Sequence, residues 1–136
     1  MTTTSSERCF IDTNVLLYWV ANDADKASAA WRIISAGAVV SVQVLNEFVA
    51  VARRKYHLDW EEVRDTIEAV AEFCEVGPIT LQTQNLAMDI AASHGLHIYD
   101  ACIVAAAELS GCDVLYTEDL NSGQRIGGIT IRNPFA

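Results

Sequence analysis

The sequence predicts an α/β fold, with one domain built on a central parallel sheet of four to five strands and helices on both faces. Short apolar runs rich in β-branched residues recur along the chain, and segments with helical periodicity separate them. Strands joined through helices require crossover connections, which give a parallel sheet covered on both sides. The length of 136 residues, of which 51% are hydrophobic, suffices for one buried core but not for two.

One strand and two helices are expected in the first part of the chain. Residues 8–12 form a short apolar strand that ends in an acid, Asp12, and a helix is expected over residues 15–20. A second helix should follow Asp25, which is a suitable N-cap residue. Gly37 should end this helix, because glycine is the residue that most often follows a helix C-terminus.

The middle of the chain is expected to hold one strand and two helices. Residues 38–42 are a continuous run of apolar, mostly β-branched residues, which is typical of a strand covered on both faces. Helical periodicity returns over residues 43–56. Residues 60–73 alternate apolar and acidic positions as an amphipathic surface helix does, and we interpret their acids as a solvated face.

The C-terminal part continues the alternation of strands and helices. The expected elements are a strand-like segment at 75–81, helices at 86–92 and 100–110, and strands at 113–117 and 129–132. We expect residues 1–6 to be a flexible N-terminus and residues 7–136 to form the single domain.

The charge balance restricts how the chain can bind nucleic acid. The formal net charge is −9 and the sequence pI is about 4.6, which argues against binding through a broad basic surface. A divalent cation held by clustered acids would reverse the field that a phosphate meets. The argument against nucleic acid therefore weakens if several of the acids gather around a metal ion, and a basic partner could also cover the acidic surface.

Cysteine usage and hydropathy indicate the compartment. The four cysteines lie far apart and include no Cys-x-x-Cys pair, so we expect reduced thiols and no zinc site. No apolar run approaches the length of a membrane span, and the first residues lack the features of a secretory signal. We expect a cytoplasmic protein without a membrane partner.

Four acids lie at positions that suit an active site. Asp12 closes the first strand and Asp119 follows another, so both should fall at the carboxyl edge of the sheet, where parallel sheets bind ligands. Asp100 opens an apolar helix, and Glu47 borders the apolar stripe of its own helix. Singly, each has an ordinary alternative: Asp12 and Asp100 as helix N-caps, Asp119 as a turn residue, and Glu47 as a solvated side chain.

Taken together, the four acids predict a metal site. Four carboxylates gathered at one edge repel one another unless a cation lies between them. Ligation by oxygen alone, without a nearby cysteine or histidine pair, favours Mg²⁺, with Mn²⁺ as a possible substitute, over zinc. Such ions activate water and stabilise the charge that develops when a phosphodiester is cleaved.

Five segments, in their order and spacing, resemble the PIN-domain nucleases, and within that family the VapC-type toxins of prokaryotic toxin–antitoxin pairs. The segments are Phe10-Ile-Asp-Thr-Asn14, Ser41-Val-Gln-Val-Leu-Asn-Glu47, Tyr99-Asp-Ala101, Tyr116-Thr-Glu-Asp-Leu-Asn121 and Asn133-Pro-Phe135. The resemblance covers nearly the whole chain.

The resemblance implies a function and a set of roles. It implies a PIN-like domain that cleaves RNA by metal-activated water, acts as the toxin of a type II pair, binds a cognate antitoxin and forms a homodimer. The family's four acidic positions, which are both catalytic and metal-binding, correspond to Asp12, Glu47, Asp100 and Asp119. Its polar residues that orient metal, water or phosphate correspond to Thr13, Asn14 and Thr117.

One basic side chain adds to the candidates. Arg54 stands seven residues beyond Glu47, on the same helical face, in the run Arg53-Arg-Lys55. It could meet an RNA phosphate or a partner's acid, or belong to a solvated charge cluster. The three histidines have no consistent ligand spacing, and we assign them no role.

Two other classes of protein remain as alternatives. A Mg²⁺-binding phospho-acceptor switch domain also places an aspartate after its first strand, but Asp12 is followed by Thr13 and Asn14 rather than by a further acid, and no lysine follows Lys55. A pure binding module would not need four acids at strand and helix ends. Neither glycine-rich phosphate-binding pattern occurs, so a nucleotide-binding role has less support.

Overall fold

The computed structural model describes residues 7–136, so the expected flexible N-terminus at 1–6 lies outside the described residues. The elements, in chain order, are β1 (Cys9–Ile11), α1 (Thr13–Val20), α2 (Ala24–Ser35), β2 (Val39–Ser41), α3 (Val42–Arg54), α4 (Trp60–Phe73), β3 (Glu75–Gly77), α5 (Leu81–His94), α6 (Ile98–Leu109), β4 (Val114–Tyr116), β5 (Arg125–Ile126) and β6 (Ile129–Arg132).

The sheet has the order β3-β2-β1-β4-β6-β5 and is parallel except at one edge. In the centre, Phe10 of β1 pairs with Val39 on one side and with Leu115 on the other. The predicted α/β fold with a mostly parallel sheet is confirmed. Within residues 7–136 the strands number six rather than four to five, because the two residues of β5 turn back on β6 in an antiparallel hairpin. So short a strand carries no periodicity that the sequence could reveal.

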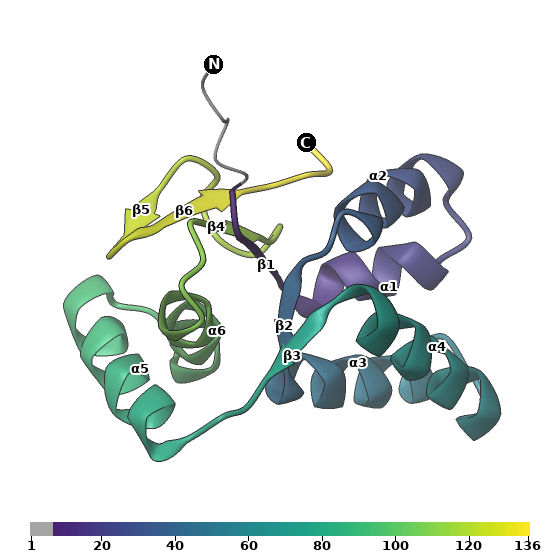
Figure 1. Cartoon of the computed structure of the whole chain (residues 1–136), viewed down its shortest axis with the longest axis horizontal. Helices are drawn as coiled ribbons and strands as arrows, with labels where there is room; N and C mark the ends of the chain where they lie inside the picture. The colour runs from purple at the N-terminus through teal and green to yellow at the C-terminus, as the bar shows by residue number, and fades with distance from the viewer. Residues whose placement is uncertain (1–6) are drawn as a thin grey trace.

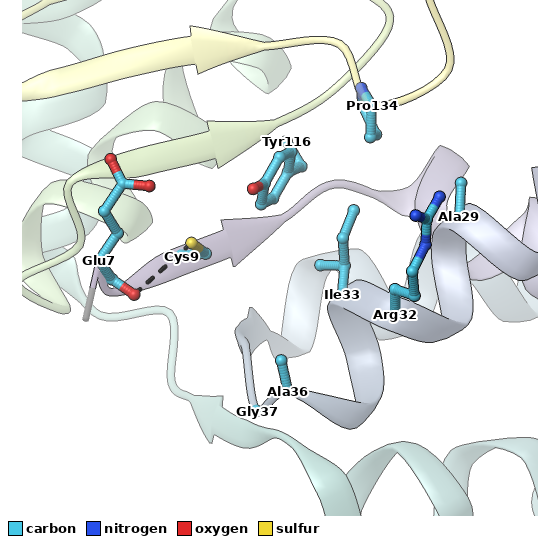
Figure 2. A pocket seen from close by; sticks show the side chains of 9 residues that line it. All are labelled: Glu7, Cys9, Ala29, Arg32, Ile33, Ala36, Gly37, Tyr116 and Pro134. Atoms are coloured by element: carbon cyan, nitrogen blue, oxygen red, sulfur yellow. Dashed lines mark hydrogen bonds between the residues drawn. The ribbon is translucent and has the colours of Figure 1, made fainter.

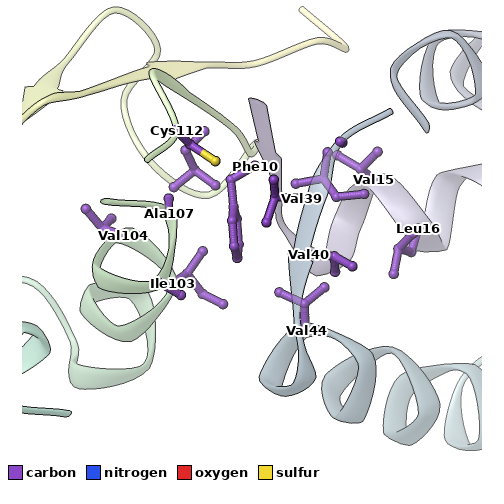
Figure 3. Packing of buried hydrophobic residues seen from close by; sticks show 14 of the residues in the cluster. Phe10, Val15, Leu16, Val39, Val40, Val44, Ile103, Val104, Ala107 and Cys112 are labelled. Atoms are coloured by element: carbon purple, nitrogen blue, oxygen red, sulfur yellow. The ribbon is translucent and has the colours of Figure 1, made fainter. Parts of the chain in front are cut away.

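Helices cover both faces of the sheet, as Figure 1 shows: α5 and α6 lie on one face, and α1 to α4 lie on the other. The core lies between these layers. In Figure 3 the ring of Phe10 points toward Ile103 and Ala107 of α6, whereas Val15 and Leu16 of α1 pack on the far side of β2. The central strand β1 is therefore shielded from water on both faces, apart from the half-buried Cys9.

Capping residues set the exact starts of three helices. Ser41 caps α3, which begins directly after β2 and so keeps the first two turns of α3 close to the sheet edge. The expectation that Asp25 caps the second helix is wrong: the side chain of Asp23 accepts from the amide of Lys26, and Asp25 lies in the first turn. His97 caps α6, so Asp100 lies inside the first turn rather than at the cap.

The structure also bears on the expectations about membrane spans and cysteines. Among the described residues, no single helix is long and apolar enough to cross a membrane, and α5 with α6 reaches that length only across a bend of 119°. All four cysteines are free thiols, three of them buried and Cys9 half-buried. The prediction of reduced thiols agrees with this arrangement.

Candidate active site

The ends of β1 and β4 bring two of the predicted acids to one edge of the sheet. Both strands are parallel neighbours, and their ladder continues one residue further, with the Asp12 amide donating to the Tyr116 carbonyl at 3.0 Å. Asp12 also caps α1, since its Oδ1 accepts from the Thr13 amide at 2.7 Å. The carboxylate is thus fixed at the point where strand becomes helix, and only 6% of the residue is exposed.

A single buried hydroxyl joins Asp12 to the loop that carries Asp119. The Oγ1 of Thr117 donates to Oδ2 of Asp12 at 2.9 Å and accepts from the Asp119 amide at 3.0 Å. The side-chain amide of Asn14 donates to Thr117 Oγ1 at 3.4 Å and to Asp119 Oδ2 at 3.3 Å. Thr117 and Asn14 therefore set the relative position of the two aspartates.

Glu47 enters the same network from α3. The Thr13 hydroxyl donates to its Oε2 at 2.8 Å, and the Gln43 side-chain amide donates to its Oε1 at 3.1 Å. Gln43 stands one helical turn before Glu47 on the same face. The same nitrogen of Gln43 lies 3.3 Å from the Tyr99 carbonyl oxygen, which connects Glu47 to the start of α6. The prediction that Glu47 points toward a cleft agrees with this half-buried position.

Asp100 joins the group through its charge. It lies half-buried in the first turn of α6, and the pKa of Asp119 is raised by burial and then by the negative charge of Asp100. Glu47 adds a weaker contribution of the same sign to Asp119. All four predicted acids therefore interact, three through hydrogen-bonded contacts and the fourth through electrostatic repulsion.

The cluster holds more negative charge than its surroundings neutralise. Burial raises the pKa of Asp12 to about 6, and the charges of Asp119 and Glu47 push in the same direction, although its hydrogen bonds from Thr13 and Thr117 oppose the shift. Among residues 7–136, the two ion pairs join other acids, Glu75 and Glu7, to Arg8 and Arg132 respectively. A cation bound at the cluster would relieve this repulsion.

The residues fit a divalent cation in charge and donor type. Asn14 Oδ1 is buried beside Asp119 and has no hydrogen-bond partner among the described residues, a costly state that a bound ion or its water would correct. Carboxylate and amide oxygens are the donors that Mg²⁺ and Mn²⁺ prefer. In the described part of the chain, no three acidic, histidine or cysteine side chains already form a group that could hold a metal. Enclosing an ion therefore requires some of the four carboxylates to move closer together.

Two adjoining cavities give access to Glu47 and Asp119. One, of about 470 Å³, is lined by Thr13, Asn14, Glu47, Arg54 and Asp119, among others. The second, of about 1000 Å³, shares Glu47 and Arg54 with the first and extends to the start of α6. Arg54 is exposed and, as predicted, lies on the same side of α3 as Glu47.

The cavity in Figure 2, of about 670 Å³, is a different one. It lies between α2 and the strands β1 and β4, and Cys9, Arg32 and Tyr116 are among its lining residues. None of the four acids lines it. It therefore has no part in the candidate active site.

Sequence reasoning did not assign roles to two residues of the site. Gln43 orients Glu47, and its place one turn before that acid was the available signal. Glu118 is an additional acid beside Asp119 that lines the smaller cavity and accepts a hydrogen bond from the Tyr18 hydroxyl at 2.9 Å. The resemblance singled out its neighbour Asp119, and nothing in the sequence assigned a role to Glu118 as well.

Comparison with known proteins gives a consistent set of similarities. The family model for the PIN domain matches residues 9–125. A toxin–antitoxin complex from Klebsiella pneumoniae is 22% identical with a TM-score of 0.69, covering 93% of this chain and 98% of that chain. DNA-bound VapBC from Salmonella typhimurium is also 22% identical, with a TM-score of 0.70 and coverage of 95% and 99%.

The description of a third similar structure names what that toxin cleaves. The sarcin–ricin-loop-cleaving toxin VapC20 of Mycobacterium tuberculosis is 21% identical with a TM-score of 0.62, covering 82% of this chain and 89% of that chain. Comparison with curated protein sequences gives no match. At these identities, the structural similarities establish a shared fold.

Proposed function

Because the chain belongs to the PIN-domain family, we propose that it is a Mg²⁺-dependent endoribonuclease whose four acids hold the metal. The observation that carries the proposal is the linkage of Asp12, Glu47 and Asp119 through the side chains of Thr13, Asn14 and Thr117. Evenly scattered surface acids would not share such a network. The buried, unpartnered Asn14 Oδ1 beside it adds a site for an ion or its water.

In the proposed hydrolysis, some residues would hold the ion and others orient those ligands. When bound, Mg²⁺ lowers the pKa of a water molecule and stabilises negative charge on the phosphate. The oxygens of Asp12, Glu47, Asp100 and Asp119 would hold the ion. Thr117 and the Thr13 amide keep Asp12 in one orientation, and the Thr13 hydroxyl and Gln43 do the same for Glu47. Fixed ligands of this kind reduce the reorganisation that the reaction requires.

RNA is the substrate that we propose. In the reaction, the water oxygen forms a bond to phosphorus and the bond from phosphorus to the leaving ribose oxygen breaks. Arg54, which lines both cavities, is placed to approach a neighbouring phosphate. The similarity to a toxin described as cleaving the sarcin–ricin loop supports RNA over DNA.

We further propose that the protein is the toxin of a type II toxin–antitoxin pair in the cytoplasm, and that it binds a cognate antitoxin and forms a homodimer. The similar structures from Klebsiella pneumoniae and Salmonella typhimurium are described as a toxin–antitoxin complex and as VapBC, and they support this proposal.

The alternative of a phospho-acceptor domain fits the site less well. An acceptor aspartate must present a free oxygen to the phosphoryl donor, whereas both oxygens of Asp12 already accept hydrogen bonds. The residue is also only 6% exposed. A metal ion is smaller than a phosphoryl donor and could still approach the remaining lone pairs of these oxygens.

Cleavage of labelled RNA by the purified chain tests the proposal. We expect cleavage with Mg²⁺ or Mn²⁺, none in excess EDTA, and restoration by Mg²⁺ without added zinc. Asp100→Asn should abolish cleavage, whereas Asp65→Asn, a matched change at an exposed acid of α4, should leave it intact. Cleavage that persists in excess chelator, or in a folded Asp100→Asn protein, would contradict the proposal.

A further inference from the structure

The cavity beside Glu47 contains an aromatic side chain that the fold does not use. Tyr99 stands next to Asp100 at the start of α6, and 66% of it is exposed. An aromatic side chain so exposed contributes little to the core, and tyrosine is enriched at interfaces because its ring is apolar and its hydroxyl is polar. Tyr99 also lines the cavity of about 1000 Å³, together with Glu47 and Arg54.

The ring of Tyr99 is held in place on one side. It lies against the ring of His97, with the centroids 5.1 Å apart and the planes tilted by 33°. His97 is fixed in turn because its Nδ1 accepts the Tyr99 amide hydrogen as the N-cap of α6. A ring supported in this way loses little conformational entropy when a flat partner stacks on it.

The position of Tyr99 relative to the acids is also fixed. Its carbonyl oxygen lies 3.3 Å from Nε2 of Gln43, and that same nitrogen donates to Oε1 of Glu47. The backbone of Tyr99 and the carboxylate of Glu47 are therefore connected through the side chain of Gln43. A nucleotide whose base lies on Tyr99 would occupy the cavity that Glu47 also lines.

Beside apolar side chains such as Val42, Ile79 and Ile98, the cavity carries polar groups that a nucleotide could contact. Arg54 supplies a cation at the boundary with the acid site, in a chain whose net charge is −9. The amides of Gln43, Asn46 and Gln84 line the same space and can meet the polar edges of a base. The volume is at the upper end of the range for ligand sites, roughly 300–1000 Å³.

From these observations we propose that Tyr99, supported by His97, is a base-stacking platform that selects single-stranded RNA for the acid site. Stacking requires an unpaired base, because a paired base is already covered on both faces. This inference rests on the proposed nuclease function and adds the residue that contacts an unpaired base. Tyr99 is a binding residue in this scheme, with no part in the chemical step.

Binding and cleavage measured separately test the platform. The full-length chain is mixed with a labelled, unstructured RNA oligonucleotide in Ca²⁺, which replaces Mg²⁺ to suppress cleavage. We expect Tyr99→Ala to weaken binding roughly five- to hundredfold, and Tyr99→Phe to retain it, because stacking needs the ring but not the hydroxyl. Trp60→Ala is the matched control, since Trp60 is 56% exposed but lines a different cavity, between α3 and α4.

Three further probes separate stacking from a general loss of structure. An RNA that carries a fluorescent aminopurine should be quenched by the wild type and by Tyr99→Phe but not by Tyr99→Ala. An oligonucleotide of the same length without bases should bind all variants equally. Duplex RNA should bind more weakly than the single strand to the wild type and to Tyr99→Phe, but not to Tyr99→Ala.

Several results would overturn the inference. They are absence of RNA binding by the wild type, equal binding by Tyr99→Ala, and equal losses with and without bases. A Tyr99→Ala protein that changes from dimer to monomer would show that the face contacts a second copy instead. If the wild type binds and quenches aminopurine but never cleaves RNA with Mg²⁺, the nuclease proposal fails while the platform stands. If the wild type cleaves and Tyr99→Ala binds and cleaves equally, only the platform fails.

Discussion

Replacing Asp12 by asparagine should stabilise the metal-free protein at neutral pH, although it should remove activity. The pKa of Asp12 is raised from 3.8 to about 6, mainly by burial, so its ionised form costs free energy in the folded state. Two pKa units correspond to roughly 3 kcal/mol. Below about pH 4 both the folded and the unfolded chain hold the protonated acid, and the penalty is absent. It grows as the pH rises through about 4 to 6 and is complete above about 6.

Asparagine recovers only part of this free energy. Its amide nitrogen replaces one of the two oxygens that accept hydrogen bonds, from the Thr13 amide and the Thr117 hydroxyl. That hydroxyl already accepts from the Asp119 amide, so a poorly satisfied contact of about 1 kcal/mol remains. The net gain for Asp12→Asn is about 1 to 2 kcal/mol, or several degrees in melting temperature for a chain of this size.

Thermal unfolding followed by circular dichroism measures this gain. In EDTA the variant should melt above the wild type at neutral pH, and the difference should vanish or reverse near about pH 4. Added Mg²⁺ should raise the melting temperature of the wild type and have much less effect on the variant. Asp65→Asn, an exposed acid on α4, controls for the change of net charge. A variant that is less stable than the wild type at neutral pH in EDTA would refute the reasoning.

Three other experiments test the site and the toxin proposal. Thr117→Val removes the hydroxyl shared by Asp12 and Asp119. In a Mg²⁺ titration of cleavage, we expect activity or apparent Mg²⁺ affinity to fall roughly 10–100-fold. An unchanged titration would exclude this orienting role. Arg54→Ala should weaken RNA binding more than metal binding and flatten a shallow salt dependence of roughly one to three log units per log unit; a steep slope, or one that the change leaves intact, would count against it. Expression of the wild type alone should slow the growth of a host, and equal growth with Asp100→Asn would reject the toxin proposal.

Much of the fold could be predicted because its elements carry strong periodic signals. The helix at Trp60–Phe73 and the strand at Ile129–Arg132 have the predicted bounds. Helix α5 extends beyond the predicted 86–92, because Thr80 and Thr83 form a capping box at its start and Gly95 adopts a positive φ at its end. A polar capping box and a glycine turn are local features, and a search for periodic apolar residues does not detect them.

The sequence predicted which acids would lie near one another, but not the hydrogen bonds that connect them. Strand ends indicated where Asp12 and Asp119 would meet, since parallel neighbours end at the same edge. The sequence could not indicate that Thr117 donates to one aspartate while accepting from the backbone of the other, because that depends on a loop conformation. It also could not indicate the role of Gln43, whose two contacts lie on different elements.

The backbone hydrogen bonds that continue past the ends of β1 and β4 make one part of the site more resistant to local opening than the rest. The amides of Asp12 and Thr117 donate to Tyr116 and Arg132 within the central sheet, so their hydrogens should exchange with solvent only when the whole domain opens. Asp119 is exposed and lies in the loop after β4, so its backbone belongs to the part of the molecule that can open locally. The part of the site held by the sheet is thus as stable as the fold itself, whereas the loop that carries Asp119 can open without unfolding the strands.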